Sequence, residues 1–206
     1  MMIRLSPQMK KGKVSVEEAV AVRRSVRDFD PKSITLEELS TLCWVGQGIT
    51  NPNGGYRAAP SAGATYPIFL HVALGAESVV GVDAGIYLYI SRDHVLEMVK
   101  NGDFRRALAR ASLEQMWMSD AAVTFLISAD YQHITPRYGR RGISYAHYEA
   151  GHVAENIMLE AVALGLGSCA VGAFDDSRVA KEAGLGEDEV PLLLIPVGHI
   201  ARSRFV

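Results

Sequence analysis

Apolar and polar residues alternate with a helical period along residues 144–174, the longest such pattern in the chain. Spacings of three and four predict a helix with a core-facing stripe. From Ile157 onward the apolar residues spread around the helix, so we expect it to be central and buried on most sides. Gly165 is expected to end this helix, because glycine adopts the left-handed conformation at little cost. The small residues at 167–173 then favour a short strand that a flat ligand could approach closely.

Two more helices are predicted near the N-terminus by capping boxes. Ser15 and Thr35 each precede a glutamate by three positions, so each pair can satisfy free N–H groups of a first helical turn. The first helix is expected to end at the arginine-rich residues 23–27, and the second at Gly46.

The rest of the chain mixes strands with short helices. Residues 103–116 should form a helix, and Asp175 or Asp176 should cap a last helix that ends at Gly184. Residues rich in β-branched and aromatic side chains predict strands at 68–74, 85–90, 121–129 and 191–198. A loop is expected at 51–63, where prolines and glycines gather. The order favours one α+β domain over residues 1–206, with 1–14 as an N-terminal arm.

Composition and charge narrow the classes of function. The chain has 206 residues, of which 49% are hydrophobic, so it can bury a sizeable core. A formal net charge of -2 gives no overall reason to expect nucleic acid or an anionic membrane as a partner. We find no secretory signal and no apolar run that could span a bilayer, so a cytoplasmic protein is expected. Cys43 and Cys169 are expected to be buried thiols.

One segment has the residue spacing of a dinucleotide-binding motif but not the order of elements that the motif requires. Gly165, Gly167 and Ala170 fit the form G-x-G-x-x-A. That motif requires a strand before it and a helix after it, whereas the order here is reversed. The sequence therefore argues against a Rossmann domain.

The segment RRSVR at residues 23–27 is the most chemically pointed part of the chain. Three arginines so close together repel one another unless an anion lies among them, and guanidinium groups suit phosphate oxygens. Ser25 could add a hydroxyl donor. The alternative is a solvated basic face that pairs with Asp28 and Asp30, and spacing alone does not decide between them. A second candidate phosphate contact is the pair Arg202 and Arg204.

Metal and nucleophile motifs are weak. Glu149 and His152 form a Glu-x-x-His pair, but di-iron sites of this kind need a second such pair, which the sequence lacks, so no metal is expected. Neither Ser61 nor Ser168 stands in a G-x-S-x-G elbow. A polar and aromatic cluster could line a pocket mouth or form a packed dimer seam. Its members are Tyr138, Arg140, Arg141, Tyr145, His147 and Tyr148.

Three ordered motifs resemble those of the FMN-dependent nitroreductase superfamily. They are RRSVRDF at 23–29, PSAGATYP at 60–67, and GHVAENIMLEAVALGLGSCAVGAFDD at 151–176 followed by PVG. The chain looks most similar to the SagB-type branch, which includes dehydrogenases that oxidise thiazolines and oxazolines in modified peptides. The resemblance implies an α+β fold with a central, mostly antiparallel sheet, flanking helices and a long buried helix. It also implies an intertwined homodimer with two FMN sites at the subunit interface.

The resemblance also implies roles for particular residues. Those expected to hold the phosphate, ribityl chain and pyrimidine edge of FMN are Arg23, Arg24, Ser25 and Arg27. Those expected to reach the flavin from the partner chain are Pro60, Ser61, Ala62 and Gly63. Those expected along the isoalloxazine ring are Val171, Gly172 and Ala173, with Gln115 as a further contact. Arg202 or Arg204 would close over the phosphate.

One departure from the SagB-type pattern bears on the reaction. The azoline-oxidising relatives carry a Lys-Tyr pair where this chain has Arg137 and Tyr138. Arginine stays protonated and cannot act as a general base. This weakens the case for azoline oxidation and leaves Tyr138 as the candidate catalytic residue.

The resemblance favours an FMN-dependent oxidoreductase that transfers hydride by a ping-pong scheme. The donor would be NAD(P)H and the acceptor a small electron-poor molecule such as a nitroaromatic or a quinone. One alternative is a dehydrogenase or oxidase of an organic, azoline-like substrate. The other is a non-catalytic dimer that binds flavin.

Overall fold

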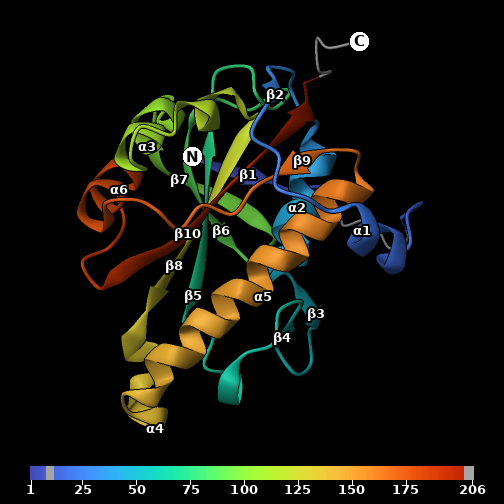
Figure 1. Cartoon of the computed structure of the whole chain (residues 1–206). Coiled ribbons are helices and arrows are strands. Elements are labelled where there is room, and N and C mark those ends of the chain that lie inside the picture. Colours follow the sequence, from blue (N-terminus) through green and yellow to red (C-terminus); the bar gives the residue numbers. More distant parts are fainter. Residues whose placement is uncertain (8–11, 202–206) are drawn as a thin grey trace.

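An antiparallel sheet of eight strands forms the centre of the fold (Figure 1). The computed structural model describes residues 1–7 and 12–201. Along the sheet the order is β1-β7-β6-β5-β8-β10-β2, and the short β9 also pairs with β10. The strands are β1 (Met2–Arg4), β2 (Phe29–Asp30), β5 (Ile68–Leu74), β6 (Gly85–Ile90), β7 (Val95–Asn101), β8 (Val123–Asp130), β9 (Gly167–Ser168) and β10 (Glu189–Ile200). A separate hairpin consists of β3 (Ile49–Asn51) and β4 (Tyr56–Arg57).

Helices cover both faces of the sheet. The α-helices are α1 (Val16–Val22), α2 (Leu36–Gln47), α3 (Arg105–Ala111), α4 (Thr135–Tyr138), α5 (Arg141–Ala163) and α6 (Asp176–Ala183). Short 3-10 helices are η1 (Ala62–Ala64), η2 (Met116–Asp120) and η3 (Tyr131–His133). The arrangement confirms the expected α+β class with a central antiparallel sheet. In the described part of the chain, none of the helices is long and apolar enough to cross a bilayer.

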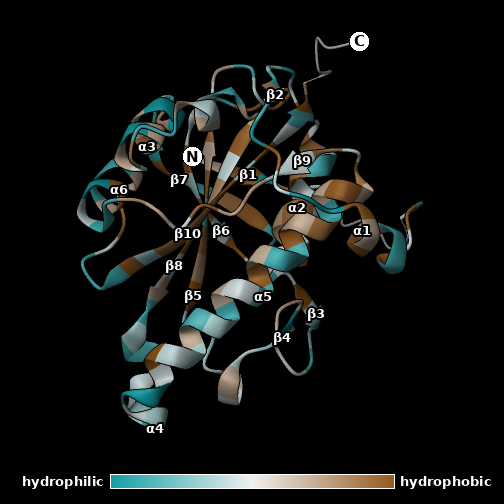
Figure 2. Cartoon of the chain, viewed as in Figure 1, coloured by the Kyte–Doolittle hydropathy of each residue, from teal (hydrophilic) through white to brown (hydrophobic). Residues whose placement is uncertain are grey.

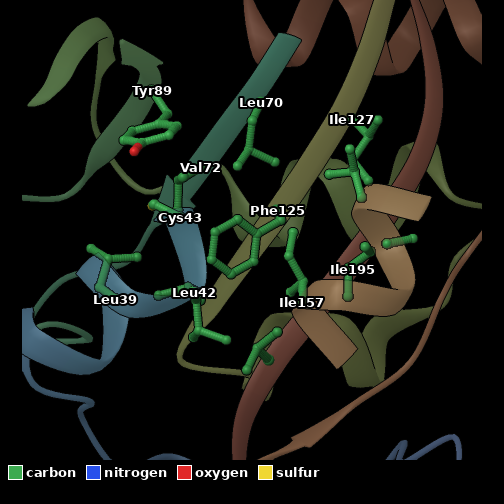
Figure 3. Packing of buried hydrophobic residues seen from close by; sticks show 14 of the residues in the cluster. Leu39, Leu42, Cys43, Leu70, Val72, Tyr89, Phe125, Ile127, Ile157 and Ile195 are labelled. Carbon is green, nitrogen blue, oxygen red and sulfur yellow. The ribbon is translucent and has the colours of Figure 1, made fainter. Parts of the chain in front are cut away.

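Alternating side chains of the central strands build two cores. On β5 and β8, Val72 and Phe125 point to the larger core, where they meet α2 and α5 (Figure 3). Ala73 and Leu126, one position further along each strand, point to the other core, beneath α3 and α6. This follows from the two-residue period of a strand. Figure 2 shows the outcome as apolar strands enclosed by helices with polar outer faces.

The long helix α5 lies against the larger core as expected (Figures 1 and 3). It begins at Arg141, three residues earlier than the start of its apolar pattern, because the chain turns at Gly139 with φ of 56°. Ile157 is fully buried, and no residue from 156 to 164 is fully exposed. Gly165 follows the helix with φ of 75°, as predicted.

Both capping boxes are present. Ser15 Oγ accepts from the N–H of Glu18, and the Glu18 carboxylate accepts from the N–H of Ser15. Thr35 and Glu38 repeat the exchange at the start of α2. Both helices therefore begin where the sequence places them.

Four expectations need correction. Residues 2–4, expected within a loose arm, pair with β7 as β1. The helix expected at 103–116 ends at Ala111, because Leu113 and Glu114 adopt positive φ. In the run 167–173 only two residues form a strand. The loop expected at 51–63 contains β4 and η1.

Candidate functional site

The arginine-rich segment runs beside β9, at the C-terminal end of α5. The Val26 N–H donates to the Ser168 carbonyl at 2.9 Å, and Ser25 forms a parallel bridge with Ser168. A Cβ atom at Gly167 would lie 2.9 Å from the Val26 side chain, closer than packed carbons approach. Glycine at 167 therefore allows the segment to lie against the strand.

The three arginines differ in their partners. Arg23 Nε lies 3.5 Å from Glu155 Oε1 on α5. Arg24 is exposed, and its Nε donates to the Val22 carbonyl at 3.0 Å. Among the described residues neither Arg24 nor Arg27 has a carboxylate partner. Two exposed cations are therefore left without a counter-charge.

The sequence left open that the arginines form a basic face paired with Asp28 and Asp30, and the predicted ion pairs are wrong. Asp30 Oδ2 contacts Lys32 Nζ at 2.6 Å. Asp28 forms no ion pair with an arginine in the described part of the chain. The arginines are solvated, but these aspartates do not neutralise them.

Residues 171–173 present two free amide groups. Val171 is buried and exchanges hydrogen bonds of 2.8 and 2.9 Å with Leu194 of β10. Gly172 and Ala173 are exposed, and their N–H groups donate to no acceptor within the described residues. The nearest atom to a Cβ at Gly172 would be a Leu193 carbon at 3.7 Å, so this edge is open. An acceptor-rich planar group could bind there.

Residues 115–117 connect the arginine segment to this edge. Gln115 Nε2 donates to the Ala173 carbonyl at 3.1 Å and to the Ser112 carbonyl at 3.0 Å. The guanidinium carbon of Arg27 lies 5.8 Å from the centre of the Trp117 ring. The predicted contact Gln115 therefore lies beside 171–173, and Trp117, which the sequence did not single out, lies beside Arg27.

The loop at 60–63 is fixed to α4 and α5. Ser61 Oγ accepts from the Tyr66 N–H at 2.9 Å, and the Ala62 N–H donates to Glu149 Oε1 at 2.8 Å. Arg137 Nη1 donates to the Gly63 carbonyl at 3.0 Å. Pro60 and Gly63 are exposed. Pro60 and Gly63 are therefore accessible from solvent, while hydrogen bonds hold the loop in place.

Gly63 could not be replaced without strain. Its φ is 59°, and a Cβ atom there would lie 2.6 Å from the Tyr138 hydroxyl and 2.7 Å from Arg137 Nη1. The left-handed backbone favours glycine, and a side chain here would also displace the ends of the Tyr138 and Arg137 side chains. This is the reason for the glycine in the PSAG motif.

The predicted residues form two groups rather than one in a single chain. The arginine segment meets α5 at Glu155, whereas the loop meets it at Glu149. Six helical residues correspond to about 9 Å along the axis. The loop and α4 lie at the end of α5 that is remote from α1 and β9 (Figure 1). Arg202 and Arg204 lie outside the described residues.

Glu149 supports the loop. It is buried, with 5% of its surface exposed, while His152 is exposed. Burial raises the pKa of Glu149, and the Ala62 N–H and the charges of His152 and Arg57 oppose that rise. The sequence showed the Glu-x-x-His spacing but gave no sign that the glutamate would bind residue 62.

The aromatic cluster packs on itself where α4 meets α5. The rings of Tyr138 and Tyr145 meet edge to face at 5.2 Å, and Tyr148 lies 6.4 Å beyond Tyr145. The Tyr131 hydroxyl lies 2.9 Å from His147 Nε2. Tyr148 remains 54% exposed, so this surface is open to a ligand or to another chain.

Comparisons with known proteins identify the family of the chain. The Nitroreductase family model matches residues 20–199. A Methanocaldococcus jannaschii protein named as a nitroreductase is 40% identical over 186 residues, which are 90% of this chain and 91% of that protein. McbC of Escherichia coli, named as a microcin B17-processing protein, is 25% identical over 171 residues, which are 81% of this chain and 62% of McbC.

A solved structure from Ralstonia eutropha, also named as a nitroreductase, superposes with a TM-score of 0.86. It is 28% identical, and the match covers 98% of this chain and 90% of that one. The family expected from the three motifs is thereby confirmed. This chain belongs to the nitroreductase family.

Proposed function

We propose that this protein is an FMN-dependent oxidoreductase that moves hydride from NAD(P)H to a small electron-poor acceptor. The observation that carries the proposal is the pairing of two kinds of donor. Arg24 and Arg27 are cations without a carboxylate partner in the described chain, and Gly172 and Ala173 offer free amide N–H groups nearby. A phosphate and a planar, acceptor-rich ring are the ligand groups that match them.

The residues present fit FMN. Arg24 and Ser25 would bind the phosphate, with Arg23 held in place by Glu155. The 172–173 amides would align the ring edge, where the absence of a side chain at Gly172 leaves room. When bound, FMN would supply two-electron transfer between donor and acceptor.

Arg27 would act through its charge. A guanidinium stays protonated throughout the physiological range, so it can keep a positive charge at the pyrimidine edge. Preorganised charges of this kind stabilise negative charge that develops during a reaction. Trp117 limits the positions of the Arg27 side chain by lying against it.

A second copy of the chain would complete each site. Within one chain the loop at 60–63 and the arginine segment meet α5 at separate points. An apolar groove of about 350 Å³ between α1, α2 and α5 includes Val16 and Trp44. Val16, Val20 and Val22 on α1 are also exposed. Exposed apolar side chains beside a groove suit a homodimer.

The proposal is tested by reduction of the purified protein. A visible flavin absorption band is expected, and anaerobic NADH or NADPH should bleach it. A nitroaromatic or quinone added afterwards should restore the band. A flavin band that neither nicotinamide donor changes would refute the nicotinamide step, and a protein that binds no FMN would refute the whole proposal.

A second candidate is a dehydrogenase of an azoline-like substrate. The relative McbC is named as a microcin B17-processing protein, and here Arg137 and Tyr138 lie against Gly63 of the loop. Arg137 cannot remove a proton, which leaves Tyr138 for that role. Bleaching of the flavin band by a thiazoline-containing peptide, without nicotinamide, would favour this reaction. FMN binding without turnover by any donor would leave the third candidate, a non-catalytic flavin-binding dimer.

A further inference from the structure

Two adjoining cavities lie beside the β3–β4 hairpin and the end of β6. Their volumes are about 220 Å³ and about 580 Å³. Four residues line both cavities, so the two are lobes around one shared wall. These residues are Arg57, Tyr66, Ser91 and Arg92.

Arg57 at this wall has donors to spare. Its Nη1 donates to Gln47 Oε1 at 2.7 Å, and its guanidinium carbon lies 4.5 Å from the centre of the Tyr66 ring. In the described chain it makes no ion pair with a carboxylate. The arginine is half-buried, and burial lowers its pKa, opposed by the neighbouring Tyr66, Tyr89 and Glu149. A half-buried cation whose hydrogen-bond partner is a neutral amide and whose other contact is an aromatic ring is best satisfied by an anion.

The walls favour an organic anion over an inorganic one. No aspartate or glutamate of the described residues lines either lobe. Arg92 adds a second, exposed cation beside Arg57. The smaller lobe continues into Phe69, Leu88 and Ile90. A ligand with a charged end at the arginines and an apolar body would therefore satisfy both parts of the cavity.

Two histidines near the cavity already contact other protein groups. His94 contacts the Tyr89 hydroxyl at 2.8 Å and the Ser6 carbonyl at 2.8 Å. His133 Nε2 lies 3.7 Å from Asp130 Oδ2. The two arginines are therefore the cations available to a ligand.

We propose that this two-lobed cavity binds an organic carboxylate that carries a flat apolar group, such as an aromatic acid. The planar guanidinium of Arg57 would donate two hydrogen bonds to the carboxylate, and Arg92 would add positive charge at the rim of the cavity. The apolar group would lie against Phe69 and Leu88. This site is separate from the arginine segment at 23–27, although Tyr66 in its wall donates its N–H to Ser61 of the loop at 60–63.

Calorimetric titration of the full-length protein with benzoate tests the proposal. Saturable binding is expected for benzoate, and at least about tenfold weaker binding for uncharged benzamide of the same shape, because a charge-assisted hydrogen bond is lost. Inorganic phosphate should compete weakly, since it leaves the apolar walls unfilled. Equal binding of benzoate and benzamide would overturn the anion assignment. Equal binding of phosphate and benzoate would overturn the assignment to an organic acid.

Matched variants locate the site. Arg92→Gln changes an exposed side chain and should weaken benzoate binding, and Arg57→Gln should weaken it further. Arg106→Gln, also exposed but on α3 and outside both cavities, is the control and should bind normally. Circular dichroism shows whether Arg57→Gln is folded, and if it is not, Arg92→Gln decides. Unchanged affinity in Arg92→Gln would place the ligand elsewhere.

Discussion

Arg24 and Arg27 show how charged side chains without a partner can indicate a ligand. Neither meets a carboxylate within the described chain, although acidic residues stand close by in sequence. Solvation leaves such charges stable in the free protein, so their placement contributes little to folding. Under the proposed function their role is in binding, with Arg24 at the phosphate and Arg27 at the pyrimidine edge of FMN.

Loss of both charges should therefore abolish flavin retention without loss of folding. We expect Arg24→Ala combined with Arg27→Ala to weaken FMN binding by about a hundredfold or more. FMN fluorescence quenching in a titration measures the affinity, and thermal unfolding of the apoprotein checks the fold. Arg106→Ala, an exposed arginine of α3, is the matched control. Normal FMN affinity in the double variant would refute the assignment of these two arginines to FMN.

Glu149 gives a prediction about pH. Burial raises its pKa above the usual value of 4.5. The folded protein then holds this proton more tightly than the unfolded chain does. The stability that the group contributes is present below the unfolded pKa and is lost as pH rises through the folded pKa. Glu149→Gln keeps an oxygen acceptor for the Ala62 N–H but does not titrate.

The free energy of unfolding of Glu149→Gln should therefore rise relative to that of the wild type as pH increases from 4.5 towards neutrality. Urea unfolding at a series of pH values measures the difference. A difference that does not change with pH, or that changes in the opposite direction, would contradict the raised pKa. Glu149→Leu should destabilise at every pH, because the half-buried Ala62 N–H loses its acceptor.

At the scale of elements, the clearest sequence patterns located their segments well. The capping boxes at Ser15 and Thr35 and the apolar period of α5 each specify a local structure through nearby residues. β5 and β6 have the predicted bounds, because both carry dense runs of apolar and aromatic residues.

Elements that depend on distant partners were missed. β7 has the sequence VLEMVKN, in which charged residues interrupt the apolar ones, and it forms because it pairs between β6 and β1. β1 has only three residues and exists only through β7. The site residues could be named only through family motifs, since periodicity does not show that Ala62 binds Glu149 or that Trp117 meets Arg27.

The short helix η1 gives a prediction with an internal control. Gly63 and Gly55 both have positive φ, but only Gly63 would place a Cβ against another side chain. Alanine at either position should cost about 1–2 kcal/mol through its backbone conformation. Gly63→Ala should cost more than Gly55→Ala in chemical unfolding, and it alone should weaken FMN binding. Equal effects of the two variants on both measurements would show that the loop at 63 has room for a side chain.

At the scale of the whole molecule, the two groups of site residues belong to opposite parts of α5. If a second copy supplies the loop, each flavin site of a symmetric dimer combines the arginines of one chain with residues 60–63 of the other. The family resemblance predicts this arrangement, but the spacing of residues in the sequence gives no distances that would separate it from a site within one chain.

Complementation between two defective variants tests this arrangement. Arg24→Ala/Arg27→Ala lacks one half of the site, and Gly63→Ala disturbs the other half. A co-expressed mixture should contain dimers in which one site is intact, so FMN content should recover to about a quarter of the wild-type value. Each variant alone should retain little FMN. A mixture with no more FMN than the two separate variants would indicate that each site is built within a single chain.

The tight contact at Gly167 also has a use in engineering. A methyl group at this position would press on the side chains of both Val26 and Ile200, the last residue of β10, while the pairings among β5, β6, β7 and β8 are untouched. Gly167→Ala should therefore shift the arginine segment at 23–27 and the end of β10 outward and leave most of the molecule assembled. If residues 23–27 bind FMN as proposed, position 167 offers a way to tune FMN retention without altering any group that touches it.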